Sequence, residues 1–122
     1  MMRFLMLIQV DESTDAGPPP DSLIAAMGDF RADTSRARIV DDGGLAPRSS
    51  ALRVQSDAGS VSVLDGPFAE AKEVIGGFFV VESASSDDMA AWTRAFVELH
   101  AAHWPGLSYV AEVREIATDP SA

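Results

Sequence analysis

The chain has no cysteine, a single lysine and no apolar run long enough to cross a bilayer. Without cysteine it forms no disulfide and offers no thiolate chemistry. Its apolar opening stops at Asp11 and Glu12 without a small-residue cleavage site, so we expect an N-terminal strand there and no signal peptide. Together these absences predict a cytoplasmic protein.

Positive charge is also scarce, since nine Lys and Arg stand against nineteen Asp and Glu, giving a net charge of −10. Binding to nucleic acid needs clustered cations. The one loose cluster, Arg31, Arg36 and Arg38, is diluted by Asp29 and Asp33. The same charge repels an anionic membrane surface. We therefore expect neither nucleic acid nor membrane as a partner, and the acidity is explained by solubility.

Recognised cofactor motifs are missing as well: no phosphate-binding loop, dinucleotide fingerprint, HExxH or CxxC occurs. We expect no cofactor. His100 and His103 lie on one face of a predicted helix, but no third ligand accompanies them, so we expect no metal. His103 also suits a core or interface position, and the roles of both histidines stay open.

The 122 residues read as one domain over 1–117 with a loose tail over 118–122. Residues 3–10 predict a strand with Phe4 and Met6 on one face and Leu5 and Leu7 on the other. A strand that is apolar on both faces is usually covered on both. Two helices can cover one face in so short a chain, so we expect a second subunit to cover the other.

Two helices are predicted. The first runs from Asp21, as its cap, to about Ser35, and the second opens at Ser85 with Asp88 three residues on, ending at Pro105 and Gly106. Their core stripes are Leu23, Met27 and Phe30 with Ile24 beside them, and Met89, Trp92, Phe96, Leu99 and His103.

The other elements are strands. Ile39 and Val40 predict a short strand followed by a turn over 41–44. Leu52 and Val54, with Val61 and Val63, predict a hairpin whose four-residue connection is 56–59, and strands follow over 78–82 and 107–116. Helices alternating with such strands indicate an α+β architecture with a mainly antiparallel sheet and both helices on one face.

Residues 65–78, DGPFAEAKEVIGGF, suit a surface loop. Asp65 is a candidate general acid or base, or else the residue that fixes a turn. Lys72 between Glu70 and Glu73 is a candidate anion anchor, or else part of a solvated ion-pair network. The pair Gly76-Gly77 precedes a strand, so we interpret it as a bend or bulge there and not as a phosphate cradle.

This segment, with Gly44 to Pro47, Trp92 and Glu112 to Arg114, resembles the DGPF subgroup of the YCII-related family. The resemblance implies a ferredoxin-like βαββ(β)αβ fold that pairs as a dimeric α/β barrel, with a cleft between sheet and helices. It also implies an association with extracytoplasmic-function sigma factors. Some members pair an early histidine with an aspartate, but the first histidine here is His100, so that dyad is not carried over.

The leading hypothesis is a cytoplasmic homodimer that binds a small polar ligand near residues 65–72. Asp65 is its candidate catalytic residue, and whether the protein is an enzyme stays open. The alternatives are a non-catalytic regulatory or interaction protein acting with a sigma factor, and a purely structural role for the motif. The candidate ligand-binding residues are Lys72, Glu70, Phe68, Phe78 and Trp92.

Overall fold

The computed structural model describes residues 1–11, 13, 15–65 and 73–117. The predicted tail over 118–122 lies outside these residues. The elements follow one another as β1 (Met2–Asp11), α1 (Asp21–Ala32), β2 (Ala37–Gly44), a 3-10 turn (Arg48–Ser50), β3 (Leu52–Asp57), β4 (Ser60–Asp65), β5 (Glu73–Ser83), α2 (Ser86–His103) and β6 (Tyr109–Glu115).

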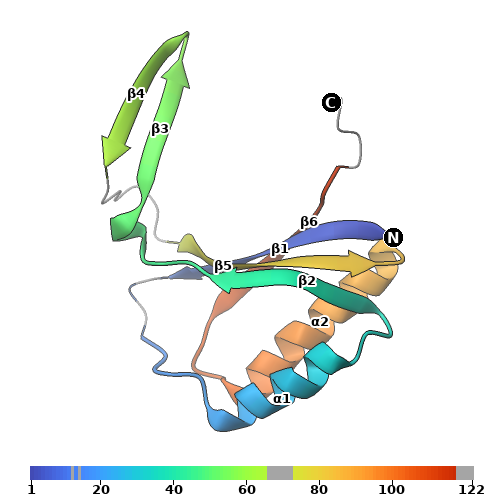
Figure 1. The fold of residues 1–122 in the computed structure, drawn as a ribbon. Coiled ribbons are helices and arrows are strands. Elements are labelled where there is room, and N and C mark those ends of the chain that lie inside the picture. The colour runs from blue at the N-terminus through green and yellow to red at the C-terminus, as the bar shows by residue number, and fades with distance from the viewer. Residues whose placement is uncertain (12, 14, 66–72, 118–122) are drawn as a thin grey trace.

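Four of the strands form one antiparallel sheet in the order β2-β5-β1-β6, and both helices lie on the same side of it (Figure 1). Without the separate hairpin β3–β4, the remaining elements have the order and strand arrangement of a ferredoxin-like βαββαβ unit. The predicted α+β, ferredoxin-like fold is therefore confirmed. Within the described ranges, no helix is both long and apolar enough to cross a membrane.

Strand β1 lies inside the sheet because it is apolar on both faces. It pairs antiparallel with β5 on one side and β6 on the other. Phe4 and Met6 point to the helices and are buried, together with Val81 from β5. Leu5 and Leu7 alternate with them and therefore lie on the face that the helices leave uncovered.

Helix α1 departs from its prediction at both ends. Pro20 and not Asp21 is its N-cap, since the Pro20 carbonyl accepts the amides of Leu23 and Ile24 and no side chain caps this end. The helix stops at Ala32, well before Ser35, because the Asp33 backbone turns to an extended conformation. The Asp33 carboxylate then accepts the amide of Ser35 and fixes that bend.

The predicted core stripe of α1 holds in part. Leu23 is buried, and Met27 and Phe30 pack partly buried against the core. Ile24, however, is 59% exposed, so its predicted core position is wrong. One helical residue covers about 100° of arc, and this step turns Ile24 away from the sheet.

The turn predicted over 41–44 is also wrong, because β2 continues to Gly44. The whole stretch pairs with β5, and a register shift between Ile39 and Asp41 absorbs one extra residue. Gly43 stands opposite Phe78, and a Cβ there would lie 3.1 Å from the Phe78 ring. The partner strand, and not local turn propensity, decides this segment.

Residues 73–77 were predicted as loop, but they form the start of β5 and pair with β1. The register skips Gly76, since Ile8 pairs with Gly77 while Gln9 pairs with Ile75. This confirms the predicted bulge at the Gly-Gly pair. A Cβ on Gly76 would lie 2.7 Å from Val10 Cγ2, so the bulge leaves no room for a side chain.

Helix α2 follows its prediction closely. The Ser85 hydroxyl accepts the Asp88 amide at 3.0 Å, which confirms Ser85 as the N-cap. Met89, Trp92 and Phe96 are buried against the sheet and α1. The helix ends at His103, just before Pro105.

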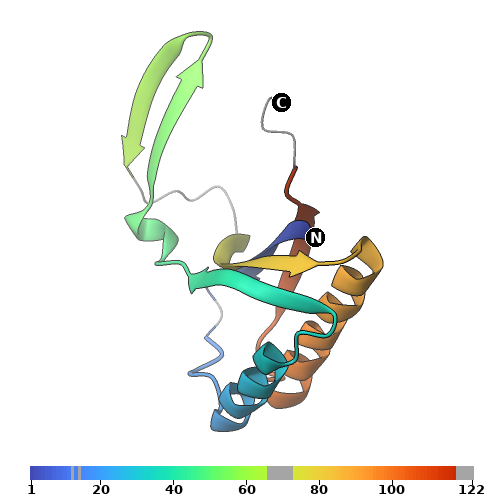
Figure 2. The same ribbon diagram turned by 45° about the vertical axis from the view of Figure 1, so that its right-hand side comes forward.

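The hairpin β3–β4 projects from the body on the side of the sheet opposite the helices (Figures 1 and 2). Its connection is the two residues Ala58 and Gly59, and not the predicted four. Both have positive φ, 49° and 87°, which matches the type I′ turn favoured by tight hairpins. The hairpin prediction is confirmed, with a shorter loop and longer strands.

Candidate functional site

The predicted catalytic residue lies at the foot of the hairpin. Asp65 is the last residue of β4 and pairs with Leu52, the first residue of β3. Phe68, Glu70 and Lys72 lie outside the described residues. The predictions that Asp65 is an acid or base, and that these three bind a ligand, therefore stay predictions.

Two other predicted ligand-binding residues, Phe78 and Trp92, lie on opposite sides of the sheet. Phe78 pairs with Leu7 on the uncovered face. Trp92 is buried on the helix side, where its ring centroid lies 5.2 Å from that of Phe30 and 5.8 Å from that of Phe96. The two side chains therefore do not share one site within a single chain.

The uncovered face of the sheet is apolar at its centre. By the alternation of the strands, this face carries Leu5 and Leu7 of β1, Phe78 and Val80 of β5 and Val110 of β6. Val110 is half exposed, and the other four are partly buried by their neighbours. We call these five residues the sheet patch.

One end of the sheet patch is bounded by a charged cluster. Glu82 accepts from Arg38 at 3.0 Å and from Arg3 at 3.4 Å. The Glu82 side chain is much less exposed than either arginine, so the two cations cover it. These charges are already paired inside one protomer.

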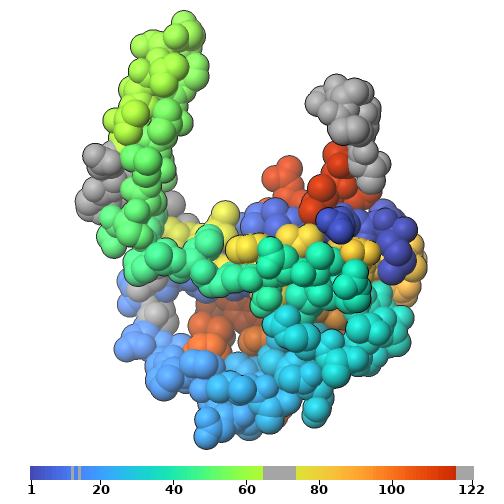
Figure 3. All heavy atoms as spheres, viewed as in Figure 1, coloured from blue at the N-terminus to red at the C-terminus, as the bar shows by residue number. Residues whose placement is uncertain are grey.

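The hairpin has two chemically different faces. Val54 pairs directly with Val63, so Leu52, Val54, Val61 and Val63 share one face, and all four are 60–69% exposed. The other face is mixed, since Gln55 pairs with Ser62 and Arg53 pairs with Leu64. We call the four-residue apolar face the hairpin patch. Figure 3 shows the hairpin standing clear of the body.

Cavities lie on the helix side of the sheet. One of them, of about 750 Å³, is an open groove between α2 and β6, with Ala90, Thr93 and Val97 on one wall and Ala111 and Val113 on the other. Another, of about 330 Å³, lies beside Trp92 next to Asp33 and Arg36. Hydrogen bonds from Ser35 lower the pKa of Asp33, so this carboxylate is a turn-forming group and not a proton carrier near neutral pH.

A smaller cavity, about 190 Å³, lies between the sheet and the C-terminal half of α2. Its walls include Phe79 and Tyr109 from the sheet, Phe96 and His100 from α2, and Trp104 and Leu107 from the segment after α2. We call it the aromatic cavity. Sequence reasoning missed Tyr109, because one tyrosine at the start of a strand carries no signal of a cavity.

The two histidines have separate surroundings. His100 stacks on Phe96 with ring centroids 4.2 Å apart, and its Nδ1 lies 2.8 Å from the Phe96 carbonyl oxygen. His103 Nδ1 lies 3.1 Å from the Ser22 hydroxyl and so links α2 to α1. Across the described residues, no three His, Asp or Glu side chains gather as a metal site would require.

Comparison with known proteins agrees with this architecture. The sequence profile of the family described as "YCII-related domain" matches residues 2–117. An uncharacterized protein of Rhizobium meliloti (strain 1021) is 40% identical over 50 residues, which are 41% of this chain and 40% of that protein. The matched stretch thus spans well under half of the relative's length.

Proposed function

Because the chain belongs to the YCII-related domain family, we propose that it acts as a cytoplasmic homodimer that binds a small polar molecule. The dimer interface consists of the sheet patch and the hairpin patch. The ligand binds near residues 65–72, with Asp65 as a candidate acid or base and Lys72 as a candidate anion anchor.

The observation that carries the dimer is the position of the two patches on the same side of the molecule. The hairpin rises on the side of the sheet that the helices leave free (Figure 1). A sheet with two apolar faces is usually covered on both. An isolated two-stranded hairpin is only marginally stable, and here its apolar face has no cover in one protomer. A second copy of the chain covers both patches at once.

The area of the uncovered sheet face supports the participation of the hairpin in the dimer interface. With strands about 4.8 Å apart and a rise of about 3.3 Å per residue, the four strands, which average about nine residues, outline roughly 570 Å². A stable interface buries about 800 Å² on each partner. The sheet patch alone is therefore small, and in a two-fold dimer each hairpin adds area by lying against the other protomer.

The Glu82 cluster at the edge of the interface is compatible with burial, and Asp41, Glu112 and Arg114 also lie on this face, opposite Val80, Leu7 and Leu5. Glu82 already accepts from Arg3 and Arg38 within its own protomer. Docking a second copy over the sheet patch therefore leaves none of these three charges without an opposite charge. An unpaired buried charge would cost several kcal/mol.

Light scattering on the purified protein tests the dimer with a matched pair of variants. Val63→Lys places a charge on the hairpin patch, and Ser62→Lys places the same charge one residue away on the opposite face. We expect a dimeric mass for the wild type and Ser62→Lys, and a monomeric mass for Val63→Lys. A monomeric wild type, or equal behaviour of the two variants, contradicts the proposed interface.

Ligand binding is tested by a thermal-shift screen against a library of small polar metabolites. A ligand at 100 times its dissociation constant adds about 2.7 kcal/mol of stability. We expect Asp65→Asn and Lys72→Ala to lose the shift. Asp57→Asn, at the other end of the hairpin ladder, is the control and keeps it. A dimer that gives no shift with any compound contradicts ligand binding and favours the regulatory alternative.

A further inference from the structure

Tyr109, which lines the aromatic cavity, carries a polar atom with no evident role in the fold. The Tyr109 hydroxyl is buried, and none of the described residues gives it a hydrogen bond. Leaving a buried hydroxyl unpaired is unfavourable, because the group gives up its hydrogen bonds to water without replacing them. Such a group calls for an explanation, and a bound ligand that pairs with it is one.

The Tyr109 hydroxyl is available as a hydrogen-bond donor across the physiological range. Burial raises its pKa to about 12, so the phenol keeps its proton. The ring is held by the fold, since Tyr109 is the first residue of β6 and pairs with Val10 of β1. It also meets the His100 ring edge to face, with centroids 5.8 Å apart.

His100 adds an acceptor to the same cavity. A carbonyl oxygen only accepts, so the contact between His100 Nδ1 and the Phe96 carbonyl requires the proton on Nδ1. In the neutral ring Nε2 then carries a lone pair and no proton. Two of the residues that line the cavity thus carry a hydrogen-bonding atom that no described residue pairs, a donor on Tyr109 and an acceptor on His100.

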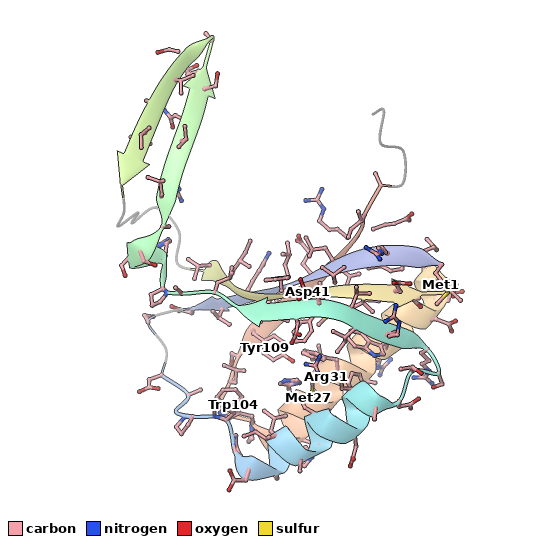
Figure 4. The ribbon with its side chains drawn as sticks, in the orientation of Figure 1. Met1, Met27, Arg31, Asp41, Trp104 and Tyr109 are labelled. Atoms are coloured by element: carbon pink, nitrogen blue, oxygen red, sulfur yellow. The ribbon has the colours of Figure 1, made fainter. Side chains whose placement is uncertain are left out.

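The remaining walls are apolar and rigid. Phe79 and Phe96 meet edge to face with centroids 5.2 Å apart. The Trp104 indole N–H donates to the Ala16 carbonyl at 3.2 Å, which fixes the ring at the far side of the cavity. Figure 4 shows Tyr109 and Trp104 on the helix side of the sheet, at the end of α2.

Size and charge define the ligand class. An apolar cavity of about 150 Å³ binds a benzene molecule, so about 190 Å³ accommodates one substituted ring. Among the described residues, no arginine lines the cavity, and the protein carries a net charge of −10. Both facts disfavour a carboxylate or a phosphate and favour a neutral molecule.

From this geometry we infer that the aromatic cavity is a binding site for a neutral, single-ring compound that carries one hydroxyl group. The ligand hydroxyl donates to His100 Nε2 and accepts from the Tyr109 hydroxyl, while its ring packs among Phe79, Phe96 and Trp104. The site is built within one protomer. It therefore does not depend on the dimer or on the segment that follows Asp65.

The test uses para-cresol as the probe, because it is a neutral ring with one hydroxyl. Tyr109 is the only tyrosine in the chain, so carbon-13 labelling of tyrosine gives a single ring signal. We expect para-cresol to shift this signal saturably. Toluene, which lacks the hydroxyl, should bind at least about tenfold more weakly. The para-toluate anion should leave the signal unchanged.

Calorimetry on two hydroxyl deletions separates this site from the larger groove. Tyr109→Phe keeps the ring and should weaken para-cresol about tenfold. Thr93→Val removes a hydroxyl that lines the groove between α2 and β6 and should leave the affinity unchanged. The inference is overturned if para-cresol does not move the Tyr109 signal, if toluene binds equally well, or if Tyr109→Phe binds like the wild type.

Discussion

Phe78 and Phe79 are consecutive residues of β5, and they lie on opposite faces of the sheet. Phe79 packs edge to face against Phe96 in the core. Phe78 pairs with Leu7 on the face that the helices leave uncovered. One step along the strand thus separates a residue that holds the protomer together from one that is available to a second protomer.

We therefore predict different effects for the two truncations. Phe79→Ala should lower the free energy of unfolding by about 3 kcal/mol at any protein concentration, because it leaves a hole in the core. Phe78→Ala should instead remove the concentration dependence that a dimer gives to stability. Urea unfolding at two protein concentrations measures both. Equal behaviour of the two variants would contradict the assignment of faces.

The bulge at Gly76 predicts that substitutions of Gly76 and Val10 affect stability in a coupled way. Gly76→Ala should lower the free energy of unfolding by about 1–3 kcal/mol, because its Cβ would meet the stiff side chain of Val10 at 2.7 Å. Adding Val10→Ala should restore part of the loss, which a double-mutant cycle measures. Gly28→Ala is the control: no atom lies within 4 Å of its Cβ, and the helix should gain up to about 1 kcal/mol.

The N-cap of α2 gives a third prediction. Ser85→Ala removes the hydroxyl that accepts the Asp88 amide and should cost about 1 kcal/mol of stability. Ser86→Ala, one residue on and exposed, should change stability by less than about 0.5 kcal/mol. Thermal unfolding of the two variants beside the wild type compares them. A similar loss in both would show that the Ser85 hydroxyl is not what stabilises this helix start.

Tyr109 makes stability depend on pH in the alkaline range. Its folded pKa, about 12, is above the ordinary value of 10.0 because burial disfavours the phenolate. The neutral form is therefore favoured by folding. This contribution is complete below pH 10 and is lost as the pH rises towards about 12. Tyrosinate absorbance should titrate late in the folded protein, and Tyr109→Phe should flatten the fall in stability over that window.

The sequence predicts an element of this fold well when the residues that determine the element are near one another in the chain. Helix α2 is predictable because Met89, Trp92 and Phe96 recur at helical spacing and Ser85 is a strong cap residue, both local properties. The chain over 41–44 is not, because Asp and Gly favour turns and only the pairing with β5 makes it a strand. The same holds for Glu73 to Gly77, where β1 imposes the pairing.

The candidate sites differ in the same way. A segment such as residues 65–72 stands out by composition, and the sequence identifies it without any geometry. The aromatic cavity depends on His100 and Tyr109 meeting across the turn after α2, and on space that their neighbours do not fill. No pattern of residue spacing in the sequence predicts this cavity. The prediction that Ile24 is a core residue is wrong for a related reason, since the burial of Ile24 depends on the angle at which α1 meets the sheet.

The central position of β1 has a consequence for synthesis on the ribosome. Met2 pairs with Ser83 and Phe4 with Glu115, so the first strand to be made waits for the last one. Such distant pairings are slow to form. Until then β1 is an extended segment, apolar on both faces, without either neighbour, which is the kind of segment that aggregates or engages chaperones. The arrangement that completes the sheet therefore leaves β1 without its β6 neighbour until the last strand of the sheet has been made.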